Sequence, residues 1–272
     1  MRFLSKVGIV GHGYVGSALK HCIKDAVVYD IDAEKSEVKS LADLIDCDVI
    51  FICVPTPANS DGSCDISIVC KVIQELTYEV DKAKSNLLNP PSPILIIKST
   101  MPPGTTDLLQ TKTSLSLVFS PEFLREATHL RDMKATTRII LGGDTPDTLR
   151  VSPIINSYFK KATIAHTDAR MAETVKYATN AFLATKVGFA NEMFGLVEHL
   201  DLDYMHFRDL FLLDKRINRS HLEVPGPDGK FGFGGSCLPK DLKGLIHTLK
   251  EHELNHNILE GVLKTNEVVR DD

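Results

Sequence analysis

The sequence lacks the features of a membrane protein, a secreted protein and a nucleic-acid-binding protein. No apolar run approaches the roughly 20 residues that a membrane-spanning helix needs, and the residues after Met1 lack the apolar core of a secretory signal. The formal net charge is -5, with acidic and basic residues interleaved, so no basic stripe is available to follow a phosphate backbone. We therefore expect a cytoplasmic protein that binds neither a membrane nor nucleic acid.

Cysteines are few, and they are scattered along the chain. They show neither the short paired spacings of a zinc site nor the density of a secreted disulfide scaffold. We expect reduced thiols and no metal site. The six cysteines are Cys22, Cys47, Cys53, Cys64, Cys70 and Cys237.

The 272 residues suffice for two domains and a sizeable core. Hydrophobic residues make up 43% and charged residues 25%, which is typical of a folded globular protein. Apolar runs that do not alternate with polar residues predict buried parallel strands, with helices between them. Strands are expected at 6–10, 26–29, 48–54, 94–97, 116–119 and 138–141.

A different pattern begins at Asp168, which we expect to cap one long helix that reaches Leu200 without a proline. Two further helices are expected after the glycine-rich segment 225–235. The predicted fold class is α/β, with an N-terminal Rossmann-like, doubly wound parallel sheet followed by an all-α central domain. We place the first domain at residues 1–165 and the second at 166–272.

The segment from Gly11 to Gly16 matches the pattern G-x-G-x-x-G between a predicted strand and a predicted helix. Gly11 permits a tight turn, Gly13 lets the backbone approach a pyrophosphate, and Gly16 lets the helix pack closely with its N-terminus towards the anion. Asp30, at the end of the next strand, accepts hydrogen bonds from ribose hydroxyls and repels a 2′-phosphate. This context predicts NAD as the cofactor; the alternative for Asp30 is a carboxylate that caps a turn.

Other cofactor contacts are expected close to these residues. Thr56 and Thr100 each lie just beyond an apolar strand, where open α/β sheets bind their ligands. Tyr14 and Val15 belong to the glycine turn itself. Lys35 adds a positive charge near Asp30, which weakens the preference for NAD over NADP only slightly.

Cys237 lies where a glycine-rich loop meets a predicted helix, close to lysines. A helix N-terminus and neighbouring positive charge favour a thiolate, which is the form that acts as a nucleophile. The alternative is a small buried hydrophobic residue, which suits the other five cysteines. We therefore single out Cys237 as the candidate nucleophile.

Lys176 and Asn180 project from one face of the long helix, a turn apart, and Glu173 lies three residues before Lys176. An ammonium and an amide aimed at one oxygen stabilise the negative charge that develops on it in a reaction. The alternative is a solvated helix face, on which both residue types are common. The residues alone leave these two interpretations open.

Six motifs in order resemble those of the UDP-glucose/GDP-mannose dehydrogenase family. They span most of the chain, so coincidence is remote. The motifs are the turn at 11–16, CVPTP at 53–57, STMPPGT at 99–105, SPEFLRE at 120–126, AETVKYATNAFLA at 172–184 and FGFGGSCLPKD at 231–241.

The resemblance implies an NAD-dependent, four-electron oxidation of a nucleotide sugar at C6. NAD takes a hydride from C6, Cys237 adds to the aldehyde, and a second NAD takes another hydride and leaves a thioester, which water hydrolyses. The motif at 120–126 looks like that of the glucose and mannose branch. UDP-glucose is therefore our first choice of substrate, and GDP-mannose is an alternative.

By the same resemblance, Asp241 assists proton transfer with bound water, Glu122 is a base for hydrolysis, and Lys176 and Asn180 stabilise the oxygen at C6. Nicotinamide-side contacts are implied for Glu126 and Lys240. Arg216 matches an arginine that reaches the substrate of the neighbouring subunit, which implies a homodimer built on the long helix. Substrate contacts are implied for Glu122, Phe123, Leu124, Arg125, Glu126, Lys176, Asn180, Arg216, Phe231 and Gly234.

The sequence also departs from the family pattern. Members usually carry a C-terminal Rossmann-like domain that binds the UDP, whereas this sequence stops just after the central helices. Either the sequence is a fragment, or it is a natural minimal form that uses a separate UDP-binding polypeptide. We expect low activity from the chain alone. The segment between Asp30 and Asp48 is also short, which predicts the loss of a strand or helix from the first sheet.

Two other functions stay open at this point. A dehydrogenase of small β-hydroxy acids also pairs a Rossmann domain with a long helix bearing lysine and asparagine, but it does not need Cys237. A catalytically silent NAD-binding homologue fits the shortened sequence, but an unused site is expected to lose its reactive residues.

Overall fold

The structure is a computed structural model that describes residues 5–84 and 90–270. Residues 1–4, where a secretory signal would begin, lie outside the described residues. The chain forms two compact units. Unit 1 comprises Met1–Pro57 and Asp65–Lys176, and unit 2 comprises Ala58–Cys64 and Tyr177–Asp272. The assignment of functional domains to 1–165 and 166–272 stays a prediction.

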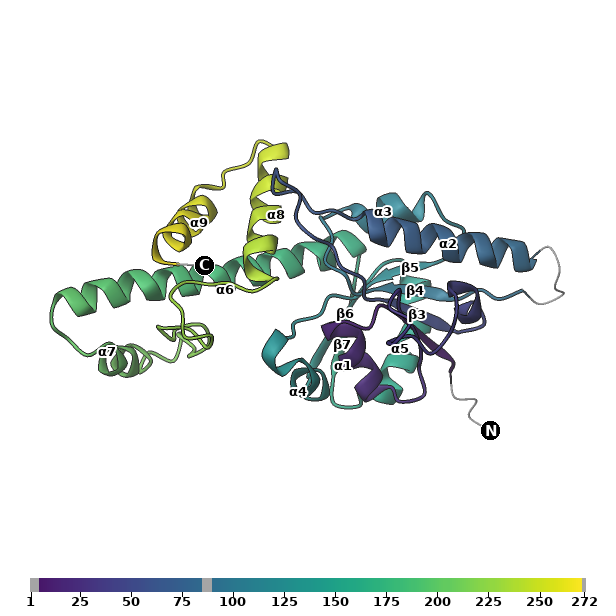
Figure 1. Ribbon diagram of the computed structural model, residues 1–272, viewed down its shortest axis with the longest axis horizontal. Coiled ribbons are helices and arrows are strands. Elements are labelled where there is room, and N and C mark those ends of the chain that lie inside the picture. The colour runs from purple at the N-terminus through teal and green to yellow at the C-terminus, as the bar shows by residue number, and fades with distance from the viewer. Residues whose placement is uncertain (1–4, 85–89, 271–272) are drawn as a thin grey trace. The chain divides into compact units, whose positions relative to one another are not determined.

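Unit 1 contains a seven-stranded sheet in the order β2-β1-β3-β4-β5-β6-β7 (Figure 1). All neighbouring pairs are parallel except β5 and β6, which pair antiparallel at Phe119 and Gly142. The α/β prediction is confirmed, with this one reversed pairing. The strands are β1 (Val7–Val10), β2 (Val27–Tyr29), β3 (Val49–Ile52), β4 (Ile94–Ile97), β5 (Leu117–Phe119), β6 (Arg138–Gly142) and β7 (Thr163–Thr167).

Helices cover both faces of the sheet, so the central strands are buried on both sides (Figure 1). Every residue of β3 and β4 is buried, which explains their unbroken apolar sequences. Each fully buried isoleucine contributes roughly 1.5–3 kcal/mol. One face packs against α1 (Tyr14–Cys22), α4 (His129–Lys134) and α5 (Thr145–Tyr158), and the other against α2 (Ser67–Lys84) and α3 (Thr105–Gln110).

The parallel strands bring their carboxyl ends to one edge of the sheet, and the segments that follow them carry most of the predicted site residues of unit 1. Between Asp30 and Ser40 the described chain forms no helix or strand, and only the short 3-10 helix η1 (Leu41–Leu44) precedes β3. The sheet consequently ends at β2 on this side, as the short segment predicted.

Helix α6 (Ala169–His199) is the predicted long helix. The side chain of Asp168 accepts a hydrogen bond from Met171 N at 2.8 Å and so caps the first turn, as expected. The division between the two units falls within this helix, after Lys176. Unit 2 also contains α7 (Tyr204–Phe211), α8 (Leu238–Glu251) and α9 (Asn257–Val269), and it is helical as predicted.

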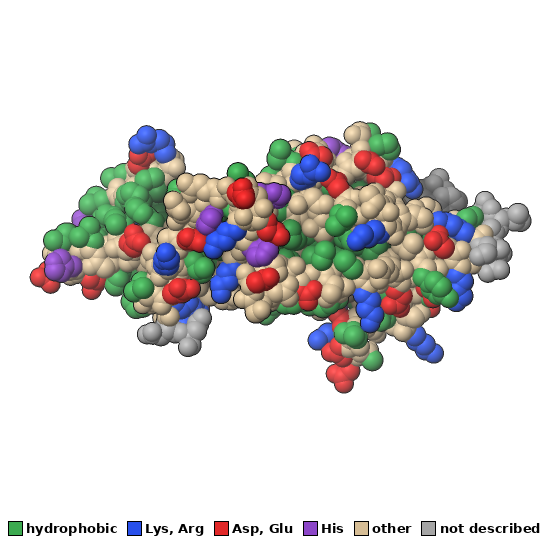
Figure 2. Space-filling model, turned by 90° about the horizontal axis from the view of Figure 1, so that it is seen from above, with side chains coloured by type: hydrophobic (Ala, Val, Ile, Leu, Met, Phe, Trp, Pro, Cys, Tyr) green, Lys and Arg blue, Asp and Glu red, His purple; other side chains and the backbone are tan. Residues whose placement is uncertain are grey.

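Among the described residues, no helix is long and apolar enough to cross a membrane. Within residues 5–84 and 90–270, no group of three or more His, Cys, Asp or Glu side chains could hold a metal ion. The face in Figure 2 shows acidic and basic side chains intermingled rather than gathered in a broad basic patch.

Candidate functional site

The glycine turn in unit 1 has the geometry that its sequence predicts. Gly11 has a φ of +92°, and a Cβ atom there would lie 2.8 Å from the Cys53 carbonyl oxygen. A Cβ atom on Gly16 would lie 1.8 Å from the Gly11 carbonyl oxygen, so α1 packs against the turn too closely for any side chain. At Gly13, by contrast, a Cβ atom would meet nothing within 4 Å. The open space lies at the glycine expected to face the pyrophosphate, so the turn fits a dinucleotide.

Asp30 faces this turn from the end of β2. Its Oδ2 accepts a hydrogen bond from His12 N at 2.5 Å, and its Oδ1 accepts one from Asp32 N at 2.9 Å. Each carboxylate oxygen can accept a second bond, so ribose hydroxyls can still bind. Lys35 Nζ lies 3.0 Å from Asp32 Oδ2, which directs its charge towards that carboxylate.

The other predicted cofactor residues lie around the same edge, apart from Lys240, which belongs to unit 2. Thr56 is buried beyond β3, and Thr100 is half-buried beyond β4. Tyr14 begins α1 and is 56% exposed. Its ring lies edge-on to His129, with centroids 5.3 Å apart. The remaining two are Val15, which is half-buried, and Glu126, which begins η2 (Glu126–Thr128).

Glu122 and Lys176 form an ion pair in unit 1. Lys176 Nζ donates to Glu122 Oε1 at 2.9 Å and to the Glu122 carbonyl oxygen at 2.8 Å. Leu124 N donates to Glu122 Oε2 at 2.6 Å. Burial raises the pKa of Glu122, but Lys176, the Leu124 N–H and Lys98 together outweigh it, and the net pKa lies below the usual value. Glu122 is therefore ionised at neutral pH.

Lys98 was not predicted from the sequence. It is the first residue after β4 and is 8% exposed. Its Nζ donates to the Pro121 carbonyl oxygen at 3.2 Å and to Ser120 Oγ at 3.3 Å. Burial lowers the pKa of Lys98 to about 8, although Cys53 and Glu122 act in the opposite direction. An ionisable residue directly after a buried apolar strand was the signal that could have identified it.

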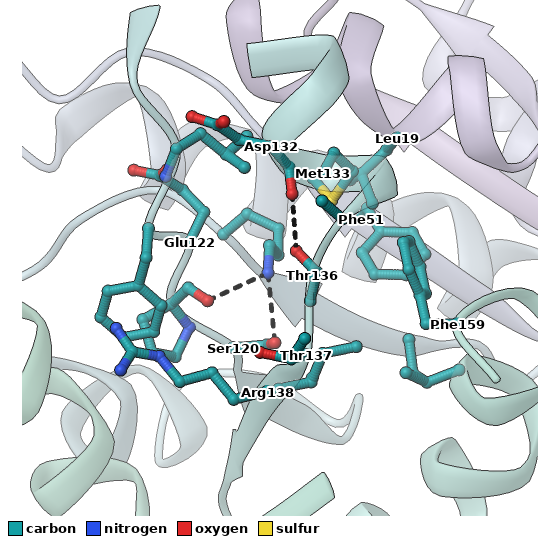
Figure 3. A pocket seen from close by; sticks show the side chains of 17 residues that line it. Leu19, Phe51, Ser120, Glu122, Asp132, Met133, Thr136, Thr137, Arg138 and Phe159 are labelled. Atoms are coloured by element: carbon teal, nitrogen blue, oxygen red, sulfur yellow. Dashed lines mark hydrogen bonds between the residues drawn. The ribbon is translucent and has the colours of Figure 1, made fainter. Parts of the chain in front are cut away.

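Lys98 also lines a pocket of about 190 Å³ in unit 1. In Figure 3, Glu122 and Arg138 lie on one side of this pocket, and Phe51 and Phe159 lie on the other. The dashed lines to Ser120 and to the neighbouring carbonyl are the two bonds that the lysine donates. The pocket therefore combines a polar wall with an apolar wall.

Phe123 and Arg125, which follow Glu122 in the chain, make further contacts within unit 1. Two cations lie over the Phe123 ring, with Arg138 Cζ at 4.5 Å and Lys176 Nζ at 5.7 Å from its centroid. Arg125 donates to both carboxylate oxygens of Asp132, at 2.9 Å and 2.6 Å. Its guanidinium thus has a carboxylate partner in unit 1, and the substrate contact that the resemblance implied for Arg125 stays a prediction.

Cys237 lies in unit 2, at the N-cap position of α8, as its sequence context predicts. It is half-exposed, and its Sγ lies 3.5 Å from Ser236 Oγ. Two cysteines of unit 1 have environments that disfavour a thiolate. Burial raises the pKa of Cys47 to about 11 and that of Cys53 to about 12.

Asp241, one turn into α8, is 1% exposed and lies between two donors of unit 2. Asn180 Nδ2 donates to its Oδ2 at 2.5 Å, and Lys240 Nζ donates to its Oδ1 at 2.6 Å. Asn180 and Lys240 thereby orient a carboxylate four residues from Cys237 in sequence. The hydrogen bond from Asn180 to Asp241 joins two residues to which the resemblance assigned separate roles.

The remaining predicted substrate contacts also belong to unit 2. Phe231 is 41% exposed, and its ring lies 5.3 Å from that of Phe194. A Cβ atom on Gly234 would lie 2.1 Å from a guanidinium nitrogen of Arg270. The side chain of Arg216 is 89% exposed and pairs with Asp214 at 2.5 Å.

Comparison with known proteins identifies both parts of the chain. Residues 42–161 match the NAD binding domain of the UDP-glucose/GDP-mannose dehydrogenase family. Residues 170–268 match the central domain of the same family.

Individual relatives agree with these matches. A UDP-glucose 6-dehydrogenase from Rickettsia bellii is 33% identical over 82% of this chain and 50% of its own length. A putative UDP-glucose 6-dehydrogenase from Bacillus subtilis is 31% identical over 96% of this chain and 67% of its own. The chain spans about half the length of most of the curated relatives it matches.

Solved structures have the same fold. A UDP-glucose dehydrogenase from Pyrobaculum islandicum has a TM-score of 0.82 and 28% identity, and the match covers 98% of this chain and 69% of that one. A 3-hydroxyisobutyrate dehydrogenase from Mycobacterium tuberculosis has a TM-score of 0.75, with 96% of this chain and 92% of that one covered. Its identity is 17%, so this likeness concerns the fold alone. From its two domain matches and its relatives, the chain belongs to the UDP-glucose/GDP-mannose dehydrogenase family.

Proposed function

We propose that the chain is the NAD-binding and catalytic part of a nucleotide-sugar 6-dehydrogenase that oxidises UDP-glucose to UDP-glucuronate. The observation that carries this proposal is the placement of Cys237, half-exposed at the start of α8, in a family whose relatives are named for this activity. Bound NAD would supply the hydride acceptor, once for each of two oxidations. Gly11, Gly13, Gly16 and Asp30 would hold it.

The reaction divides into two oxidations and a hydrolysis. The first oxidation removes a hydride and a proton from the C6 alcohol and leaves an aldehyde. The Cys237 thiolate then adds to the aldehyde carbon, and the former aldehyde oxygen takes up a proton to give a thiohemiacetal. The second oxidation removes a hydride and the hydroxyl proton from this thiohemiacetal and leaves a thioester. Water attacks the thioester, the C–S bond breaks, and the products are a carboxylate and the regenerated thiol.

The polar residues have distinct proposed roles. Lys176 and Asn180 stabilise the oxygen at C6 as it gains negative charge. Asp241, which Asn180 and Lys240 orient, accepts and returns protons through water. Glu122 is ionised and therefore available as the base that activates water for hydrolysis. Glu126 and Lys240 remain proposed nicotinamide-side contacts, and Arg216 a proposed contact to the partner's substrate.

A homodimer is part of the proposal. Helix α6 exposes Phe182, Phe189 and Leu196 at a spacing of seven residues, and they are 63%, 44% and 50% exposed. Residues seven apart lie on one face of a helix, so these three side chains form an apolar stripe. Such a stripe is typical of a helix that packs against another chain.

The direct test follows NADH absorbance after the chain is mixed with UDP-glucose and NAD. We expect slow NADH formation in the parent chain and its loss in Cys237→Ser, with Cys64→Ser as the matched control. A dehydrogenase of β-hydroxy acids does not require Cys237, so retained turnover on such an acid by Cys237→Ser would favour that alternative. Calorimetry distinguishes a silent NAD-binding homologue, which would bind NAD without binding UDP-glucose.

A further inference from the structure

The glycine-rich loop before Cys237 is held by two buried asparagine side chains of unit 2. Asn191 of α6 accepts a hydrogen bond from Gly232 N at 3.0 Å. Asn266 of α9 accepts one from Phe233 N at 2.6 Å and donates to the Phe233 carbonyl oxygen at 3.0 Å. The exposed fractions of Asn191 and Asn266 are 6% and 8%.

Asn266 binds both polar backbone atoms of one loop residue, which fixes that peptide segment in position and in orientation. The fit is close, because a Cβ atom on Gly232 would lie 2.4 Å from Asn266 Oδ1. Gly232 also has a φ of +67°, a conformation that side-chain-bearing residues rarely adopt. Asn266 can therefore bind the loop only because residue 232 is a glycine, and its hydrogen bonds in turn hold the loop in this conformation.

The side chain of Phe233 also anchors the loop, because it is buried among the helices of unit 2. It is 4% exposed and packs in a core cluster with Leu242 and Ile246 of α8 and Val262 of α9. The loop is thus held by its backbone from α6 and α9 and by its side chain against α8. Four residues later the chain reaches Cys237 at the start of α8.

From this geometry we propose that Asn266 is a positioning residue for the Cys237 thiol. By fixing Phe233, it holds the loop so that Cys237 lies at the N-terminus of α8, where the helix dipole favours the thiolate. The amide does not titrate, so this support is independent of pH. The role rests on the proposed chemistry at Cys237.

The test measures alkylation of each cysteine by iodoacetamide as a function of pH, with peptide mass spectrometry as the readout. In Asn266→Ala we expect Cys237 alkylation to slow about tenfold below the thiol pKa and its pH midpoint to rise, because a rise of one pKa unit lowers the thiolate fraction tenfold. Asn257→Ala is the matched control, since Asn257 lies exposed at the start of the same helix. It is expected to leave the profile unchanged.

Asn266→Asp is the second variant, since it keeps the size and the acceptor but loses the donor to the Phe233 carbonyl oxygen. It is expected to raise the Cys237 midpoint above that of the parent, and this result stands by itself if Asn266→Ala does not fold. An unchanged Cys237 midpoint in both variants, or a change matched by newly reactive Cys47 and Cys53, would overturn the positioning role.

If the proposed chemistry at Cys237 is wrong, the alkylation experiment gives a different result. In that case Cys237 of the parent chain would react no faster than a cysteine in an unfolded peptide. Hydrogen exchange at the amides of Gly232 and Phe233 then decides the inference alone. Faster exchange in Asn266→Ala, but not in Asn257→Ala, would support it, and equal exchange would contradict it.

Discussion

The carboxylate of Glu173 accepts hydrogen bonds from both the backbone N–H and the hydroxyl of Thr106, at 2.8 Å and 2.6 Å. It also accepts one from Gly104 N at 2.6 Å. Glu173 is fully buried in α6, so this single side chain satisfies the N-terminus of α3 and holds the segment that follows Thr100.

Glu173→Ala is expected to lower the free energy of unfolding by about 2–4 kcal/mol, because it leaves buried N–H groups without an acceptor. Urea denaturation measures the loss. Glu192→Ala is the control, since Glu192 lies exposed on the same helix, where its side chain accepts a hydrogen bond from the Thr265 hydroxyl. Similar losses in the two variants would contradict the role assigned to Glu173.

The same carboxylate gives a pH dependence. Burial raises the pKa of Glu173, and the hydrogen bonds from Thr106 and Gly104 offset this only in part. The folded state then holds the proton more tightly than the unfolded state, whose pKa is about 4.3. As pH falls from neutral towards that value, the parent should gain stability relative to Glu173→Gln. Parallel denaturation curves at several pH values check this sign; a constant difference would contradict it.

Gly13 and Gly16 form a matched pair in the cofactor turn. Gly13→Ala should lower the free energy of unfolding by less than about 1 kcal/mol, because the added Cβ meets nothing within 4 Å. It should nevertheless weaken NAD binding about tenfold, because the Cβ fills the space expected for the pyrophosphate. Gly16→Ala should destabilise the fold by about 3 kcal/mol or more, because its Cβ would overlap the Gly11 carbonyl. Thermal melting and calorimetric titration with NAD separate the two effects. Unchanged NAD affinity in Gly13→Ala would place the cofactor elsewhere.

Lys98 should titrate far below an ordinary lysine. Its pKa of about 8 lies under the unfolded value of about 10.4, so between these values the unfolded chain binds more protons and stability should rise with pH. Lys98→Met removes this rise. NMR of lysine side chains should show one ammonium that titrates near pH 8 in the parent and is absent from the variant. A parent spectrum in which every lysine titrates near pH 10 would contradict the burial argument.

Much of the fold was predictable because it follows from local sequence. The strand at Ile94–Ile97 was predicted to the residue, since both of its faces are buried and the apolar run has no interruption. The strand at Thr163–Thr167 was missed because it is polar and largely exposed. The antiparallel pairing of Phe119 and Gly142 was missed because an apolar run carries no information on strand direction.

The candidate site divides in the same way. The glycine turn and the start of α8 are continuous segments, so their geometry could be inferred from spacing. Lys98 and Asn266 were missed because their partners lie 22 or more residues away in sequence. Contacts of this kind depend on how helices and strands pack against one another. They cannot be inferred from local patterns in a single sequence.

Peptide mass spectrometry after acid quenching shows whether Cys237 carries the oxidised sugar as a thioester. The chain is incubated with NAD and UDP-glucose, and the peptide containing Cys237 is examined for an added UDP-sugar acyl group. We expect this adduct on Cys237 alone, with Cys22, Cys47, Cys53, Cys64 and Cys70 unmodified. NADH formation with an unmodified Cys237, continuing at the parent rate in Cys237→Ser, would contradict this expectation.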